Sequence, residues 1–129
     1  MFKISTDSVK NRLYLTISGY ISTEEAKQIK TRIETETEKL TDGFDVVNDI
    51  SNFRLGHDDA GVLMGNVFNY FKTKKVMYVI RVIGSSQSGL IQFAKHSQDF
   101  EAPPEIKYLP TIAEAEEYLD SVNEKAAKV

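Results

Sequence analysis

Cysteine and long apolar runs are both absent from this chain of 129 residues, and each absence removes whole classes of protein. Without cysteine there is no disulfide framework, no thiol catalysis and no cysteine-ligated metal. No apolar stretch approaches the roughly 20 residues that cross a bilayer, and residues 1–5 are too short and polar for a signal peptide. We therefore expect a soluble protein of the cytoplasm.

A concentrated charge of one sign is also missing. Sixteen basic residues against nineteen acidic residues give a formal net charge of -3, with both signs interspersed along the chain. Duplex nucleic acid and acidic membrane surfaces both require a concentrated basic patch, so neither is an expected partner. The one dense basic cluster, Lys72 with Lys74 and Lys75, is expected to be a solvated helix end, where cations favour the negative end of the dipole.

The pattern of apolar residues predicts strands that alternate with helices, which indicates one α/β domain over residues 1–129. Five strands are predicted, at residues 2–4, 13–17, 44–50, 75–83 and 106–109. Four helices are predicted, at residues 23–40, about 58–72, a short one from 90, and one from 111. Ser22 with Glu25, and Thr111 with Glu114, have the spacing of capping boxes. The order is therefore β-β-α-β-α-β-α-β-α, with residues 124–129 expected to fray.

The junction between the third strand and the second helix is the most informative segment, with the sequence Asp58-Asp59-Ala60-Gly61-Val62. Apolar residues recur at helical spacing after it, so the helix is expected to start close to Asp58. Aspartate is a preferred N-cap because its carboxylate accepts hydrogen bonds from the free amides of the first turn. The helix dipole would stabilise a carboxylate or a phosphate at this position.

The order strand, Asp-Ile-Ser, short loop, Asp-x-x-Gly-Val, apolar helix resembles the STAS domain, the family of sulfate transporters and anti-sigma factor antagonists. The resemblance covers roughly residues 2–122 and implies a mixed sheet. In regulatory members of the family the loop resembles Asp-Ser-Ser-Gly-Leu, and phosphorylation of the second serine breaks a protein complex. Ala60 stands at the position of that serine, so the phosphate acceptor is absent.

The resemblance implies a non-enzymatic regulatory module without a cofactor, with a kinase-type anti-sigma factor as the first candidate partner; a homodimer is compatible with it. We expect the partner to dock through residues 53–59 and the first turns of the following helix. The expected partner-binding residues are His57, Asp58, Asp59, Gly61, Val62 and a partly exposed Tyr70. Because Ala60 cannot be phosphorylated, binding is either constitutive, or the aspartates supply a fixed charge that resembles the phosphorylated state.

A metal or acid–base site is a second interpretation of the same loop. His57, Asp58 and Asp59 could gather with Asp49 from the end of the preceding strand. Helix capping and a polar surface loop explain these residues without a ligand, and His96 lacks the spacing of a metal ligand. We therefore predict no metal site, no catalytic residue and no hydrolase activity, and expect Asp49 to shape the loop.

Two further alternatives concern small ligands. The glycine- and serine-rich turn at residues 84–89 lacks the Gly-Lys-Ser/Thr ending of a nucleotide loop, but it could present amides and hydroxyls to an anion, at Ser85, Ser86 and Ser88. A carrier or sensor of a small apolar ligand or lipid is the main alternative function. Its cavity, between helices and sheet, would be lined by Met64, Phe68, Tyr78 and Phe93.

Overall fold

One sheet organises the part of the chain that the computed structural model describes, residues 1–54, 59–84 and 104–127, without the side chains of 59–64 and 125–127. Its strands lie side by side in sequence order: β1 (Phe2–Asp7), β2 (Arg12–Gly19), β3 (Asp45–Phe53), β4 (Tyr78–Val82) and β5 (Glu105–Leu109). The β1 strand is antiparallel to β2, and the other neighbours are parallel. The predicted mixed sheet of five strands is therefore confirmed.

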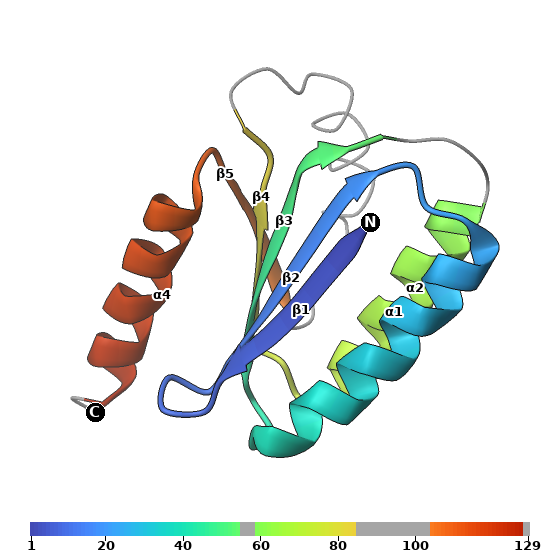
Figure 1. Cartoon of the computed structure of the whole chain (residues 1–129). Helices are drawn as coiled ribbons and strands as arrows, with labels where there is room; N and C mark the ends of the chain where they lie inside the picture. The colour runs from blue at the N-terminus through green and yellow to red at the C-terminus, as the bar shows by residue number, and fades with distance from the viewer. Residues whose placement is uncertain (55–58, 85–103, 128–129) are drawn as a thin grey trace.

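Helices cover both faces of this sheet (Figure 1). On one face lie α1 (Thr23–Glu36), which continues into the short 3-10 helix η1 (Thr37–Lys39), and α2 (Asp59–Thr73). On the other face lies α4 (Ile112–Ala127). The helix predicted from residue 90 falls outside the described residues. The last helix reaches Ala127, so it continues past residue 124, where the sequence led us to expect fraying.

The buried side chains form two clusters because successive residues of a strand point to opposite faces of the sheet. The larger cluster lies under α1 and α2, and its fully buried members include Leu13, Ile29, Ile33 and Val46. The smaller cluster lies under α4 and consists of Val47, Ile80, Val82, Ala115 and Leu119. In β4, Val79 belongs to the first cluster while Ile80 and Val82 belong to the second, as expected for a strand covered on both faces.

Both predicted capping boxes mark helix starts. The Ser22 hydroxyl accepts a hydrogen bond from the amide of Glu25 at 3.1 Å, at the start of α1. The Thr111 hydroxyl accepts one from the amide of Glu114 at 3.2 Å, at the start of α4. Each bond satisfies an amide of the first turn that has no partner within the helix.

The first helix ends earlier than predicted, at Glu36 rather than at residue 40. The Thr37 hydroxyl donates a hydrogen bond to the carbonyl of Ile33 at 2.7 Å. The chain tightens into η1 after Glu36, and Leu40 is already extended.

No helix in the described part of the chain is both long and apolar enough to cross a membrane.

Candidate functional site

The parallel strands β2, β3 and β4 end at the same edge of the sheet, at the top of Figure 1. In open α/β sheets this carboxyl edge is where ligands bind, because the loops that follow the strands converge there. The chain that leaves β4 lies against the last residues of β3, since a Cβ atom added at Gly84 would lie 3.4 Å from Cβ of Ser51. The segment that the sequence singled out follows β3, at this edge.

An open groove lies at the ends of β2 and β3. We call it the carboxyl-edge groove, and its residues are Ser18, Gly19, Tyr20, Ser51, Asn52, Phe53 and Arg54. The Arg54 amide donates a hydrogen bond to the Gly19 carbonyl at 3.0 Å, which joins the two loops. Tyr20 is 62% exposed, and Arg54 is exposed beside it. Tyrosine and arginine are the residue types that most often anchor protein interfaces.

The second helix starts where the sequence predicted. Its first residue is Asp59, so Ala60, Gly61 and Val62 lie in its first turn. His57 and Asp58 fall outside the described residues, as do the side chains of Asp59 and Val62. The structure thus brings the backbone of this turn to the carboxyl edge, and it leaves the capping role of Asp58 a prediction.

Asp49 lies in β3, four residues before the strand ends, and its loop-shaping role stays a prediction. Its Oδ1 atom accepts two hydrogen bonds from Ser51, one from the amide at 3.0 Å and one from the hydroxyl at 2.6 Å. Both residues belong to β3, and the bonds lie where its register with β2 shifts, between the pairs Thr16–Asp49 and Ser18–Asn52. Among the described residues there is no group of three acidic or histidine side chains that could hold a metal ion. The predicted anion contacts Ser85, Ser86 and Ser88 lie outside the described residues.

Tyr70 lies far along α2 from the first turn of that helix. Eleven residues separate it from Asp59, which corresponds to roughly 16 Å along the helix. It is half-buried against the larger cluster, and its hydroxyl shares a hydrogen bond of 2.7 Å with the hydroxyl of Thr37. Tyr70 therefore fastens η1 to α2, and its contact with a partner stays a prediction.

The cavity proposed for a carrier is small and differently lined. A space of about 30 Å³ lies between the sheet and the helices α1 and α2, room for one or two water molecules. Of the two predicted lining residues whose side chains the structure describes, Phe68 borders it and Tyr78 does not. Tyr78 points to the other face of the sheet, where its ring packs edge-on against Tyr118 at 6.0 Å between centroids. Phe93 and the Met64 side chain lie outside the described residues.

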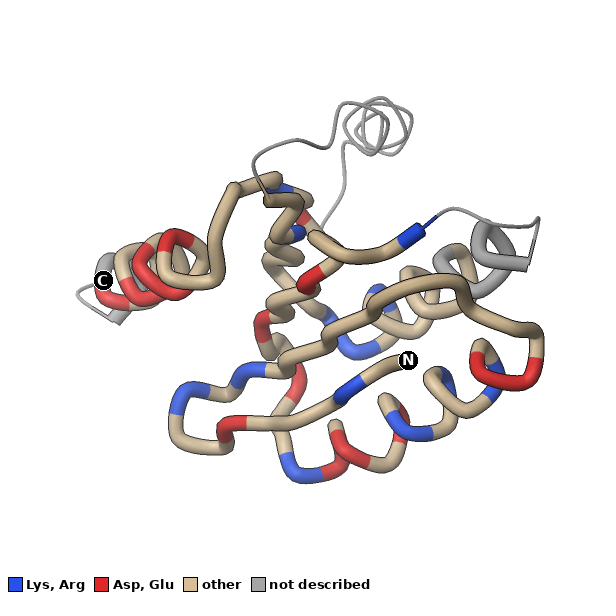
Figure 2. The backbone as a smooth tube through the Cα atoms, turned by 45° about the horizontal axis from the view of Figure 1, so that its top comes forward, with Lys and Arg blue, Asp and Glu red and all other residues tan. Residues whose placement is uncertain are grey.

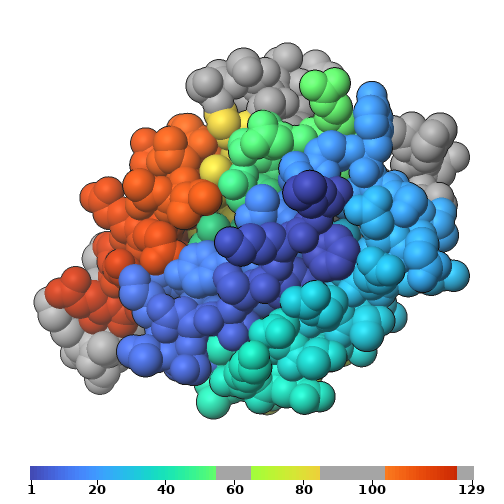
Figure 3. All heavy atoms as spheres, viewed as in Figure 1, coloured from blue at the N-terminus to red at the C-terminus, as the bar shows by residue number. Residues whose placement is uncertain are grey.

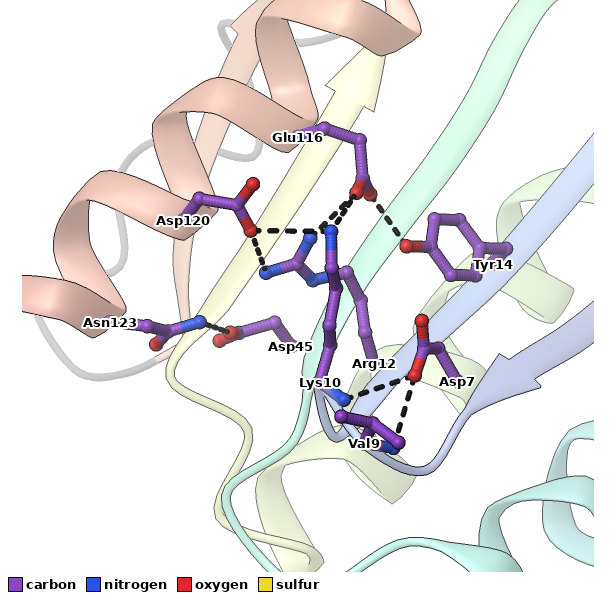
Figure 4. A network of polar contacts seen from close by, with 9 residues as sticks. All are labelled: Asp7, Val9, Lys10, Arg12, Tyr14, Asp45, Glu116, Asp120 and Asn123. Atoms are coloured by element: carbon purple, nitrogen blue, oxygen red, sulfur yellow. Dashed lines mark hydrogen bonds and ion pairs between the residues drawn. The ribbon is translucent and has the colours of Figure 1, made fainter.

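A polar cluster that the sequence did not predict joins β2 to α4 (Figure 4). The Arg12 side chain is 1% exposed, and its two terminal nitrogens donate to Glu116 at 2.9 Å and to Asp120 at 3.1 Å. Lys10 donates to Glu116 at 3.2 Å. Burial alone would raise the pKa of Glu116, but hydrogen bonds from Tyr14, Lys10 and Arg12 lower it overall.

A second contact of the same kind ties the start of β3 to the end of α4. The buried Asp45 carboxylate accepts a hydrogen bond from the Asn123 side chain at 3.0 Å. Burial raises the pKa of Asp45, although Asn123 and the charge of Arg12 act in the opposite direction. Acidic residues recur along α4 (Figure 2), and those that face the sheet meet cationic side chains of the β1–β2 hairpin. This cluster attaches α4 to the β1–β2 hairpin and to β3, and its charged groups pair with one another, so we assign it a structural role.

Tyr14 provides a test of this cluster. Its hydroxyl donates to Glu116 at 2.6 Å, and burial together with that carboxylate raises its pKa to about 12. A raised pKa means that Tyr14 contributes stability below its unfolded pKa of about 10, and that this contribution is lost as the pH rises toward 12. Ultraviolet titration should show one tyrosine ionising near pH 12 that is missing in Tyr14→Phe. Identical titrations of the two proteins would contradict the hydrogen bond to Glu116.

Comparisons with known proteins identify the fold. No family model matches the chain, and no curated protein matches it. Among solved structures, the phosphorylated form of the Bacillus cell fate determinant SpoIIAA superposes with a TM-score of 0.64, over 92% of this chain and 99% of that one. The chain has a SpoIIAA-like fold. Only 11% of the aligned residues are identical, so the likeness concerns the arrangement of strands and helices and not the chemistry of the loops.

Proposed function

We propose that the chain is a non-enzymatic regulatory module that resembles an anti-sigma factor antagonist and binds a protein partner through residues 53–65. The observation that carries the proposal is the position of Asp59, Ala60 and Gly61. They form the first turn of α2, at the carboxyl edge, in a fold shared with a protein known in a phosphorylated form. The exposed Tyr20 and Arg54 of the carboxyl-edge groove extend this surface with residues suited to an interface.

The absence of a hydroxyl at Ala60 determines how such a module is regulated. A phosphoryl group needs an oxygen acceptor, so this position cannot carry the serine switch of the regulatory STAS proteins that the sequence resembles. If binding is constitutive, Ala60→Glu should release the partner by adding charge at the centre of the surface. If Asp58 and Asp59 already act as a fixed phosphate-like charge, Asp59→Asn should strengthen binding instead.

Substitutions in the first turn of α2 test the docking surface. We expect Gly61→Arg to weaken partner binding by about 100-fold or more, because it inserts a long side chain at the centre of the interface. If binding is constitutive, we expect the same of Asp59→Lys, because it reverses a charge there. The partners to assay are kinase-type anti-sigma factors, beginning with any that a neighbouring gene encodes. Binding is measured by titration calorimetry, and circular dichroism verifies that each variant folds.

Matched controls test whether the effect is specific to the first turn of α2. Glu117→Lys makes the same charge change at an exposed position of α4, on the other face of the sheet. Asn69→Arg introduces the same side chain as Gly61→Arg, roughly 12 Å further along α2. Both controls should bind as the unmodified chain does. Folded variants of Asp59 and Gly61 that bind with unchanged affinity would refute the proposed surface.

A further inference from the structure

The β1 strand forms one edge of the sheet, and among the described strands it pairs only with β2. Figure 1 shows it at the front rim of the sheet, with α1 on one face of it, and in the space-filling view from the same side no described segment covers it (Figure 3). An open edge exposes a row of backbone amides and carbonyls that can accept another strand. Its six residues contain no proline and no glycine, and its register with β2 is unbroken.

The hydrogen bonds to β2 show which backbone groups are turned outward. Met1 and Ser18 exchange both of their backbone hydrogen bonds, with distances of 2.9 and 3.1 Å. In an antiparallel pair such residues alternate with residues whose amides and carbonyls face away from the neighbour. Lys3, Ser5 and Asp7 are thus bonded to β2, and the outward groups belong to Phe2, Ile4 and Thr6.

The charges of β1 are complementary to those of a second copy. When two β1 strands run antiparallel with Ser5 on the two-fold axis, Lys3 of one copy lies directly opposite Asp7 of the other. The axis generates this pair twice. The outward backbone groups of Ile4 in one copy then bond those of Thr6 in the other. Lys3 and Asp7 therefore form a non-hydrogen-bonded pair, the kind of pair in which the two side chains lie closest together. An axis at Ile4 would place Lys3 opposite Ser5 and lose both charge pairs.

The face that carries these side chains is open. Lys3 and Ser5 are exposed, because α4 covers the side of the sheet toward β5 and leaves β1 uncovered. In the space-filling view, atoms of β1 and β2 form the surface between α4 and α1 (Figure 3). Asp7 remains able to pair, since the two hydrogen bonds that it accepts from the amides of Val9 and Lys10 both use Oδ1.

We propose that the chain forms a two-fold symmetric dimer in which the β1 strands pair antiparallel about Ser5 and join two sheets into one. The same strand of each copy forms the interface and every contact occurs twice, Lys3 with Asp7 and Asp7 with Lys3, as an isologous interface requires. Lys3 would also disfavour pairing with any strand that lacks an acidic residue opposite it. The edge of β1 therefore selects a second copy of the same chain. The seam is short, so we expect a dissociation constant on the order of 10 to 100 μM.

Sedimentation equilibrium of the full chain over this concentration range tests the dimer. Lys3→Glu should weaken it by about tenfold, because two attractions become two repulsions, and high salt should weaken it as well. Lys75→Glu makes the same charge change at an exposed position before β4 and should leave the dimer intact. Thr6→Pro removes an outward amide without touching the bonds to β2, and should also weaken dimerisation.

A double-mutant cycle tests the register. Asp7→Asn preserves the turn, because the asparagine oxygen can still accept from Val9 and Lys10, and removes the charge. It should weaken the dimer of the unmodified chain by a few fold, yet strengthen the dimer of Lys3→Glu by relieving its repulsion. A chain that stays monomeric throughout, or an Asp7→Asn effect of the same sign in both backgrounds, would overturn the proposal.

Discussion

Replacing Leu119 by alanine is expected to lower the free energy of unfolding by about 3 to 4 kcal/mol. Leu119 is fully buried at the centre of the smaller cluster, between α4 and the strands β3 and β4. Truncation removes its apolar surface from the core and leaves a cavity that the surrounding strands cannot close. Because domains are commonly stable by only about 5 to 15 kcal/mol, this single change should shift the midpoint of urea unfolding strongly.

The matched control lies two residues earlier on the same helix. Glu117 is exposed, so Glu117→Ala should change the free energy of unfolding by no more than about 0.5 kcal/mol. A loss below about 1 kcal/mol in Leu119→Ala would mean that α4 does not pack on the sheet in solution. The difference between the two variants therefore shows whether the face of the sheet under α4 is packed as a hydrophobic core.

The elements of this fold could be predicted because each is encoded by neighbouring residues. The apolar run at residues 75–83 identified a strand covered on both faces, and the spacings Ser22 with Glu25 and Thr111 with Glu114 identified two helix starts. The start of α2 was predicted in the same way, from apolar residues at helical spacing. Such local patterns also carried the resemblance that led to the SpoIIAA-like fold.

Contacts between distant residues could not be predicted from such patterns. Arg12 and Glu116 are 104 residues apart, and neither position is marked by its neighbours. The carrier hypothesis had a related weakness, because it grouped Tyr78 with Phe68 of α2, although the Tyr78 side chain points to the α4 face of the sheet and α2 covers the other face. Tyr20 and Arg54 were missed because nothing in the sequence shows that they are exposed side by side, although both follow strand ends, where binding residues concentrate.

Replacing Arg12 by methionine is expected to lower the free energy of unfolding by about 3 kcal/mol. The methionine can fill part of the buried space, but it removes one of the two cations that bond the partly buried Glu116 and leaves Lys10 as the other. This loss of stability is at the low end of what breaking a buried ion pair costs. The two carboxylates stay partly hydrated, since their side chains are 24% exposed at Glu116 and 53% exposed at Asp120. Urea unfolding at neutral pH measures it.

The pH dependence distinguishes this electrostatic cost from simple loss of packing. The pKa of Glu116 is lowered in the folded chain, so its contribution is present above its ordinary value of 4.5 and is lost as the pH falls through the folded pKa. The difference between Arg12→Met and the unmodified chain should therefore shrink in acid, and Glu116→Gln should reduce it at neutral pH. A cost that is equal at both pH values and unchanged by Glu116→Gln would show that Arg12 acts through its hydrocarbon stem alone. Attachment of α4 would then rest on the apolar cluster around Leu119.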